Sequence, residues 1–113
     1  MVQAELRGIH SPDLAEPALP RDPENCVVLI QAMVGPKGEQ GEESFDFEVV
    51  ANSHQTLESA RGRVVVERFD WSRVRAIVTE GVERARGRSW AEVAELLNKQ
   101  WCWEFDNYQD FTE

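Results

Sequence analysis

The clearest pattern of hydrophobic and polar positions lies near the middle of the chain, where two strand-like segments flank a glycine-rich connection. Residues 45–49 alternate between large apolar and acidic side chains, which is the period of two expected for a half-buried β-strand. Residues 26–34 are apolar at almost every position, which is typical of a central strand with cover on both faces. Between them, Gly35, Gly38 and Gly41 supply the backbone freedom that a reversing loop needs. The pattern therefore predicts a long β-hairpin.

Three more segments have strand-like patterns. Residues 2–9 alternate between apolar and polar side chains, and residues 101–105 place three aromatic side chains on one face, where we expect them to pack in the core. Residues 63–69 are rich in β-branched side chains, but their pattern does not decide which face is buried. Residues 10–25 contain four prolines, which predicts an ordered surface loop. This loop is the candidate cover for the second face of the 26–34 strand, with a partner protein as the alternative.

The C-terminal half contains two helical patterns. Residues 71–86 place apolar side chains at spacings of three and four, with Asp70 as the N-cap and Gly87 as the expected stop. Ser89 then opens a capping box for a second, shorter helix. Because only a few residues link the two helices, we predict that they form an αα-hairpin.

These elements predict one α+β domain that covers residues 1–113. We expect a mainly antiparallel sheet of four or five strands with the αα-hairpin packed on one face. A short, weak helix is expected at residues 54–60, between the hairpin and the next strand. Residues 106–113 form a tail that need not pack against the domain.

Charge is distributed unevenly along the chain, whose formal net charge is −9. Residues 35–48 hold five acids and one lysine, and residues 101–113 hold four acids and no base. Residues 61–88 hold eight arginines and four acids, an interleaving that ion pairs explain better than nucleic-acid binding does. The net charge disfavours nucleic acids and anionic membranes as partners and suits a basic partner. Solubility alone explains such a charge about as well.

The sequence contains no signature of an enzyme. It has no phosphate-binding glycine motif, no metal-ligand spacing and no paired nucleophile and base, so we predict no catalytic residue, no cofactor and no metal. Cys26 and Cys102 are expected to be reduced, buried thiols, and a disulfide between them requires neighbouring strands. No apolar run reaches the roughly 20 residues that span a bilayer, and no signal-peptide pattern opens the chain. We therefore expect a cytoplasmic protein.

Several segments resemble the immunity protein 8 family. The hairpin sequence QAMVGPKGEQGEESFDF, at residues 31–47, resembles the signature of that family. HSPD, DPEN, VERFDW, SWAEVAELL and WEFDNY resemble further segments, so the similarity extends over nearly the whole chain. Members are small cytoplasmic proteins of bacterial polymorphic-toxin systems. The resemblance implies an immunity protein that neutralises a cognate toxin domain by stoichiometric binding.

We predict that acids of the hairpin and of the tail meet a basic surface on the toxin, which in a nuclease would be the nucleic-acid groove. The alternatives are a regulatory module that binds a protein other than a toxin and, ranked last, an enzyme. The chain is expected to be a monomer or a weak homodimer. The predicted partner-binding residues are Glu39, Glu42, Glu43, Asp46, Glu48, Asp106, Tyr108, Asp110 and Phe111.

Overall fold

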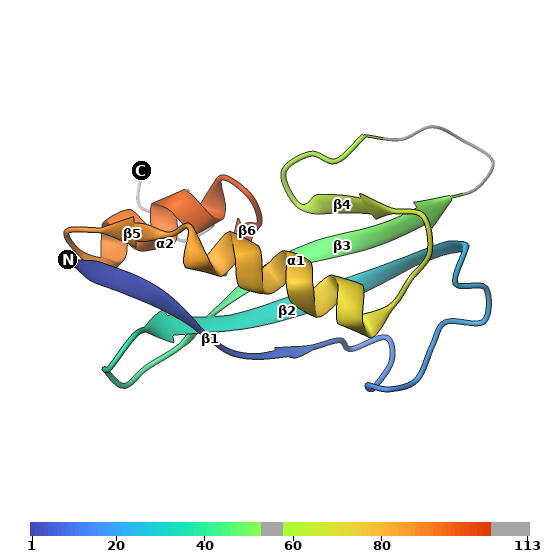
Figure 1. Cartoon of the computed structure of the whole chain (residues 1–113), viewed down its shortest axis with the longest axis horizontal. Helices are drawn as coiled ribbons and strands as arrows, with labels where there is room; N and C mark the ends of the chain where they lie inside the picture. The colour runs from blue at the N-terminus through green and yellow to red at the C-terminus, as the bar shows by residue number, and fades with distance from the viewer. Residues whose placement is uncertain (53–57, 105–113) are drawn as a thin grey trace, which may run out of the picture.

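The computed structural model describes residues 1–52 and 58–104 and shows an α+β protein with a curled, mostly antiparallel sheet and two helices (Figure 1). In chain order the elements are β1 (Val2–His10), β2 (Asn25–Pro36), β3 (Glu43–Asn52), β4 (Arg63–Val66), α1 (Trp71–Glu83), β5 (Arg86–Gly87), α2 (Trp90–Asn98) and β6 (Cys102–Trp103). The predicted fold class is confirmed. The described sheet has six strands, more than the four or five expected, because it includes the two-residue strand β5, which was not predicted. β6 also has only two residues and lies within the strand predicted at residues 101–105.

The predicted hairpin is formed by β2 and β3, which pair antiparallel from Asn25 opposite Asn52 to Val34 opposite Glu43. The alternation predicted for β3 is also confirmed. Phe45, Phe47 and Val49 are buried, whereas the acids between them point away from the core.

Both sides of this hairpin carry further strands, in the order β4-β3-β2-β1-β5. β1 pairs antiparallel with β2, and β5 pairs with only Val2 and Gln3 of β1. On its other side, β3 pairs in parallel with β4 and, nearer its start, antiparallel with β6. The structure shows which face of β4 is buried, because Val64 and Val66 pack against the core.

The two helices begin at the predicted caps. The Asp70 carboxylate accepts a hydrogen bond of 2.8 Å from the N–H of Ser72, and the Ser89 hydroxyl accepts one of 3.3 Å from the N–H of Glu92. Neither bond depends on distant parts of the chain, which is why local sequence predicted them.

The predicted end of α1 at residue 86 is wrong, and so is the role of Gly87 as its stop. The helix ends at Glu83, because the residues after it form hydrogen bonds with β1 instead. The N–H of Ala4 donates to the carbonyl oxygen of Ala85 at 3.2 Å, and the next two residues form β5. The link between the helices is therefore a short strand.

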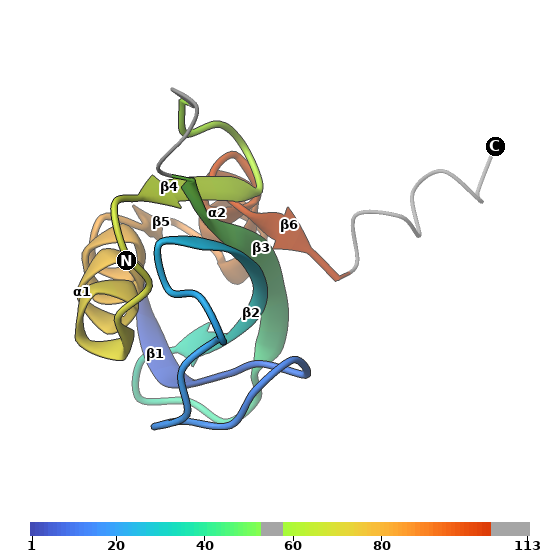
Figure 2. The same ribbon diagram turned by 90° about the vertical axis from the view of Figure 1, so that its right-hand side faces the viewer.

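The helices lie on the concave face of the sheet (Figures 1 and 2). Valines of α1 join the buried face of the hairpin to form the core. The ring of Trp101 stacks on Phe47 with centroids 5.3 Å apart, and the half-buried ring of Trp103 stacks on Phe45 at 6.3 Å. The predicted core role of these tryptophans is confirmed, whereas Phe105 lies outside the described residues.

The proline-rich loop is ordered. Its Asp13 carboxylate accepts the main-chain N–H of Leu29 on β2 at 2.8 Å, but the loop leaves Val27 on the second face of β2 exposed. It contacts the start of α1, where the indole N–H of Trp71 donates to the carbonyl oxygen of Ala18 at 2.7 Å. The N–H of Phe69 similarly donates to the carbonyl oxygen of Pro23 at 2.8 Å. Val27, on the second face of β2, is 57% exposed, so the prediction of cover is wrong at this position.

Two smaller predictions, a short helix after the hairpin and two buried thiols, are also wrong in part. Of the helix expected at residues 54–60, residues 54–57 lie outside the described part, and residues 58–60 are not helical, so the prediction is wrong there. Cys26 is half-buried, but Cys102 is exposed, contrary to the expectation of two buried thiols. Their strands, β2 and β6, flank β3 on opposite sides, so the two thiols do not form a disulfide.

Candidate partner-binding surface

The face of the sheet that points away from the helices, here called the outer face, carries the acids of β3. Because side chains alternate along a strand, burial of Phe45 and Phe47 directs Asp46 and Glu48 to the outer face. Glu42 immediately precedes the same strand and is exposed. At the usual rise per residue, Glu42 and Glu48 are separated by about 20 Å along the strand.

Glu104 adds a fourth acid to this surface, and sequence analysis did not select it. Its N–H donates to the carbonyl oxygen of Ser44 at 3.0 Å, and its carboxylate accepts the N–H of Ser44 at 2.7 Å. These bonds place Glu104 beside β3. The alternation that turns Trp103 inward was the signal that could have revealed Glu104. We call Glu42, Asp46, Glu48 and Glu104 the acidic strip.

No described lysine or arginine forms an ion pair with a member of the acidic strip. The best-placed cation is Arg63, which lies opposite Glu48 in the β3–β4 register. Its guanidinium donates instead to the carbonyl oxygen of Glu58, at 3.1 and 3.2 Å. The strip therefore presents negative charge that described cations do not neutralise by direct pairing.

An apolar strip runs beside the acidic one on β2. Val27, Leu29 and Met33 point to the outer face, where Val27 is exposed and the other two are half-buried. The register places Leu29 opposite Glu48 and Met33 opposite Ser44, so the two strips are neighbours. Exposed apolar side chains next to charged ones have the chemistry of a protein–protein interface.

The hairpin connection is anchored to the sheet. Nη2 of Arg7 donates to the carbonyl oxygens of Pro36 at 2.8 Å and Glu39 at 2.6 Å. Glu39 and Glu42 are exposed on this anchored loop. Glu43 differs from them, because its carboxylate accepts the indole N–H of Trp103 at 2.7 Å and so links β3 to β6.

The structure thus places Asp46 and Glu48 on β3 and Glu42 just before its start. Glu43 instead has a contact within the fold. Glu39 lies on the connection at the end of that strand. The predicted tail residues lie outside the described part of the chain: Asp106, Tyr108, Asp110 and Phe111.

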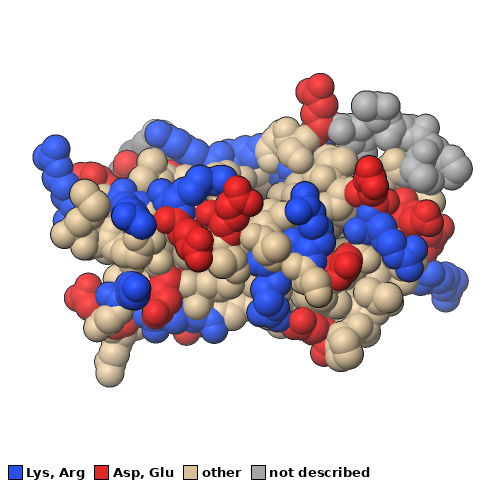
Figure 3. Space-filling view, in the orientation of Figure 1, with Lys and Arg blue, Asp and Glu red and all other residues tan. Residues whose placement is uncertain are grey.

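The arginine-rich side forms a separate groove of about 430 Å³ between β4 and α1. The cations that line it are Arg61, Arg63, Arg73, Arg84 and Lys99, and Glu80 is the acid among its described lining residues. Ion pairs use part of this charge, since Arg84 lies 3.2 Å from Glu80. On the face that carries α1, basic and acidic side chains lie next to one another (Figure 3). On this face the interleaving agrees with the ion pairing expected from the sequence.

Within residues 1–52 and 58–104, no group of three or more histidine, cysteine or acidic side chains is placed to hold a metal ion. No helix in the same residues is long and apolar enough to cross a membrane. Among the described residues, the outer face is therefore the candidate functional site.

The family model described as Immunity protein 8 matches residues 4–108. This match includes β1 from Ala4 onward, the whole β2–β3 hairpin, both helices and β6. No curated protein and no solved structure matches the chain. The family match agrees with the resemblance that the hairpin sequence carries, and the chain belongs to the immunity protein 8 family.

Proposed function

We propose that this protein neutralises a cognate toxin domain by stoichiometric binding through its outer face. Membership of the family implies an immunity protein. We propose that it acts by binding and not by catalysis. The observation that carries the proposal is the acidic strip, whose carboxylates form no ion pair with described cations. The carboxylates of Asp46 and Glu104 also accept hydrogen bonds from Ser44. Glu42 and Glu48 are exposed, and exposed charge contributes little to folding, so these two carboxylates are available for a partner.

The two strips would act at different stages of binding. Long-range attraction between the acidic strip and a basic toxin surface would speed the first encounter and select the partner. In a toxin that is a nuclease, that basic surface would be its nucleic-acid groove. Desolvation of the apolar strip, in particular Val27, would then slow dissociation.

The test compares two double variants with the same change in charge. Glu42→Gln with Glu48→Gln removes two charges from the acidic strip. Glu67→Gln with Glu95→Gln removes two exposed acids that lie after β4 and on α2. Stopped-flow association with a cognate toxin domain, to be sought in the neighbouring upstream gene, is measured at low and at high salt.

We expect the strip variant to associate at least about threefold more slowly at low salt, with a flatter salt dependence than the wild type. The control variant should associate nearly as fast as the wild type. Equal slowing of both variants would show that only net charge matters and would remove the outer face from the proposal. Failure of co-expression to protect cells that carry the toxin domain would favour the regulatory alternative.

A further inference from the structure

A second feature of the fold, separate from the outer face, is the unpaired edge of β1. β5 covers this edge only as far as Gln3, and no other described strand pairs with the side of β1 that faces away from β2. Glu5–His10 therefore continue β1 beyond the end of β5 with only one strand neighbour.

The direction of the main-chain groups follows from two hydrogen bonds. The carbonyl oxygen of Gln3 accepts the N–H of Lys37 on the β2 side, whereas the N–H of Ala4 donates to Ala85 on the β5 side. Main-chain groups alternate sides along a strand, so those of Leu6 point away from β2, as those of Ala4 do. Leu6 thus offers one donor and one acceptor at the unpaired edge.

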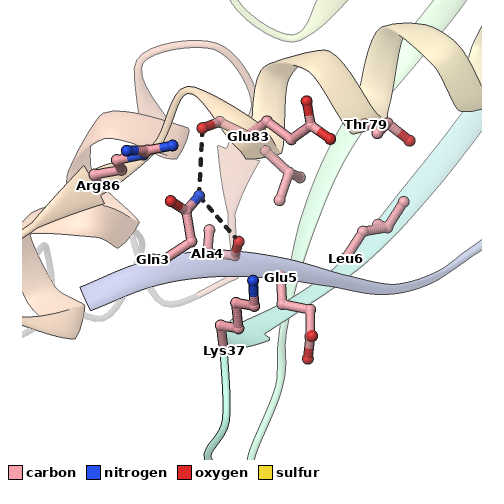
Figure 4. A pocket seen from close by; sticks show the side chains of 9 residues that line it. Gln3, Ala4, Glu5, Leu6, Lys37, Thr79, Glu83 and Arg86 are labelled. Carbon is pink, nitrogen blue, oxygen red and sulfur yellow. Dashed lines mark hydrogen bonds between the residues drawn. The ribbon is translucent and has the colours of Figure 1, made fainter. Parts of the chain in front are cut away.

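This edge opens into a groove of about 360 Å³ between β1 and the C-terminal half of α1 (Figure 4). Leu6, Thr79 and Val82 supply its apolar and small side chains. One end of the groove is already closed, because the side-chain amide of Gln3 donates to the carbonyl oxygens of Ala4 and Glu83, each at 3.3 Å. The groups at Leu6 lie beyond this closure.

We propose that an extended segment of the toxin pairs antiparallel with β1 at Leu6 and continues the line of β5. This inference rests on the proposed function, because it assigns a second contact to the same complex. A strand fits better than a small molecule, because a donor and an acceptor with strand geometry are what a strand pairs with. β5 already pairs with the same edge, which shows that the edge accepts an antiparallel neighbour.

The groove also defines the chemistry of the segment. A residue directed to the concave side of the sheet would meet Leu6 and Val82, so an apolar side chain is expected there. Its neighbours along the strand would point to the opposite side, near the half-buried Glu5. The Glu5 carboxylate already pairs with Arg7 at 3.1 Å, so polar side chains are expected there. The bulge between Leu6 and Gly8 interrupts the regular edge after Leu6, so only a short segment can pair here.

The first test uses proline to remove the outward N–H of Leu6. Proline is tolerated in a strand at positions where the N–H has no ladder partner. Pro36 of β2 already stands at such a position, opposite Ala4. Leu6→Pro is compared with Leu6→Ala, which loses the same side-chain contacts but keeps the N–H. We expect Leu6→Pro to bind the cognate toxin domain about tenfold more weakly than Leu6→Ala, as loss of one interface hydrogen bond predicts.

The second test needs no variant. Exchange of the Leu6 amide hydrogen is followed by NMR in the wild-type protein, alone and with the toxin domain. We expect slower exchange in the complex, with no change on dilution of the protein alone.

The outcomes separate the two proposals. A complex that protects cells but leaves exchange at Leu6 unchanged would overturn the edge pairing and leave the proposed function intact. Absence of any complex would overturn both. Slow exchange in the protein alone that is lost on dilution would show that a second copy occupies the edge, which would also overturn this inference.

Discussion

At Gly35, the absence of a side chain lets the hairpin connection close against the sheet. A Cβ built at this position would lie 2.1 Å from the carbonyl oxygen of Gly41 and 3.0 Å from Nη2 of Arg7. The first contact is with backbone, which cannot move as a flexible side chain can. Arg7 also anchors the connection. Glycine at position 35 therefore lets the connection that carries Glu39 and Glu42 lie close to the sheet.

Gly35→Ala should therefore destabilise the protein, by about 1–3 kcal/mol, because the loop must shift to accept the methyl group. Gly8→Ala is the matched control, since nothing lies within 4 Å of a Cβ at that position. It should change the free energy of unfolding by no more than about 1 kcal/mol. Urea denaturation of the two variants measures both values, and equal losses would contradict the role assigned to Gly35.

At the scale of elements, α1 shows how local and distant interactions divide the control of one helix. Its start depends on Asp70, whose bond to Ser72 is local. Its end depends on β1, because hydrogen bonds to a distant strand replace the last helical turn that the sequence favours. Local residues therefore set the start of the helix, and hydrogen bonds to β1 set its end.

Asp70→Ala should lower the free energy of unfolding by about 1 kcal/mol, the usual cost of losing an N-cap side chain. Ser72→Ala serves as the control, because it keeps the N–H that the cap accepts and its side chain is exposed. The control should stay within about 0.5 kcal/mol of the wild type. Thermal and urea melts of both variants test this, and a loss in the control as large as that in Asp70→Ala would show that the cap is not the cause.

At the scale of the whole molecule, charge and shape divide the surface into three regions. The outer face carries the acidic strip. The β4–α1 groove is lined by Arg61, Arg63, Arg73 and Arg84, and the β1–α1 groove exposes an unpaired sheet edge. The proposals give the first and third regions to one toxin. Both would then be occupied in a complex of fixed composition.

Protection from the toxin should accordingly titrate at a fixed ratio of the two proteins. Because binding is proposed to be the whole mechanism, residual toxin activity should fall linearly until the toxin is saturated and then stay constant. An activity titration with purified proteins at concentrations well above the dissociation constant measures this ratio. Protection by far less than one immunity protein per toxin would indicate turnover and revive the enzymatic alternative.

The sequence by itself determined the features that depend on near neighbours along the chain. Alternation in β3 predicted the burial of Phe45 and Phe47 and the outward direction of Asp46 and Glu48, because side chains on a strand repeat every two residues. The caps of both helices were predictable for a similar reason, since an N-cap bonds to a residue two or three positions later. The signature that carries the family resemblance also lies in a continuous segment, the hairpin, although further segments along the chain share the similarity.

Only the tertiary structure decided the features that depend on segments distant in sequence. The end of α1 and the strand β5 depend on Ala4, which lies some 80 residues earlier in the chain. Glu104 joins the acidic strip through its bonds to Ser44, and Glu43 is held by the indole of Trp103. The unpaired groups of Leu6 follow from where β5 stops. Each of these features depends on which distant residues folding brings together as hydrogen-bond partners, or leaves without one, and no local pattern in the sequence records that pairing.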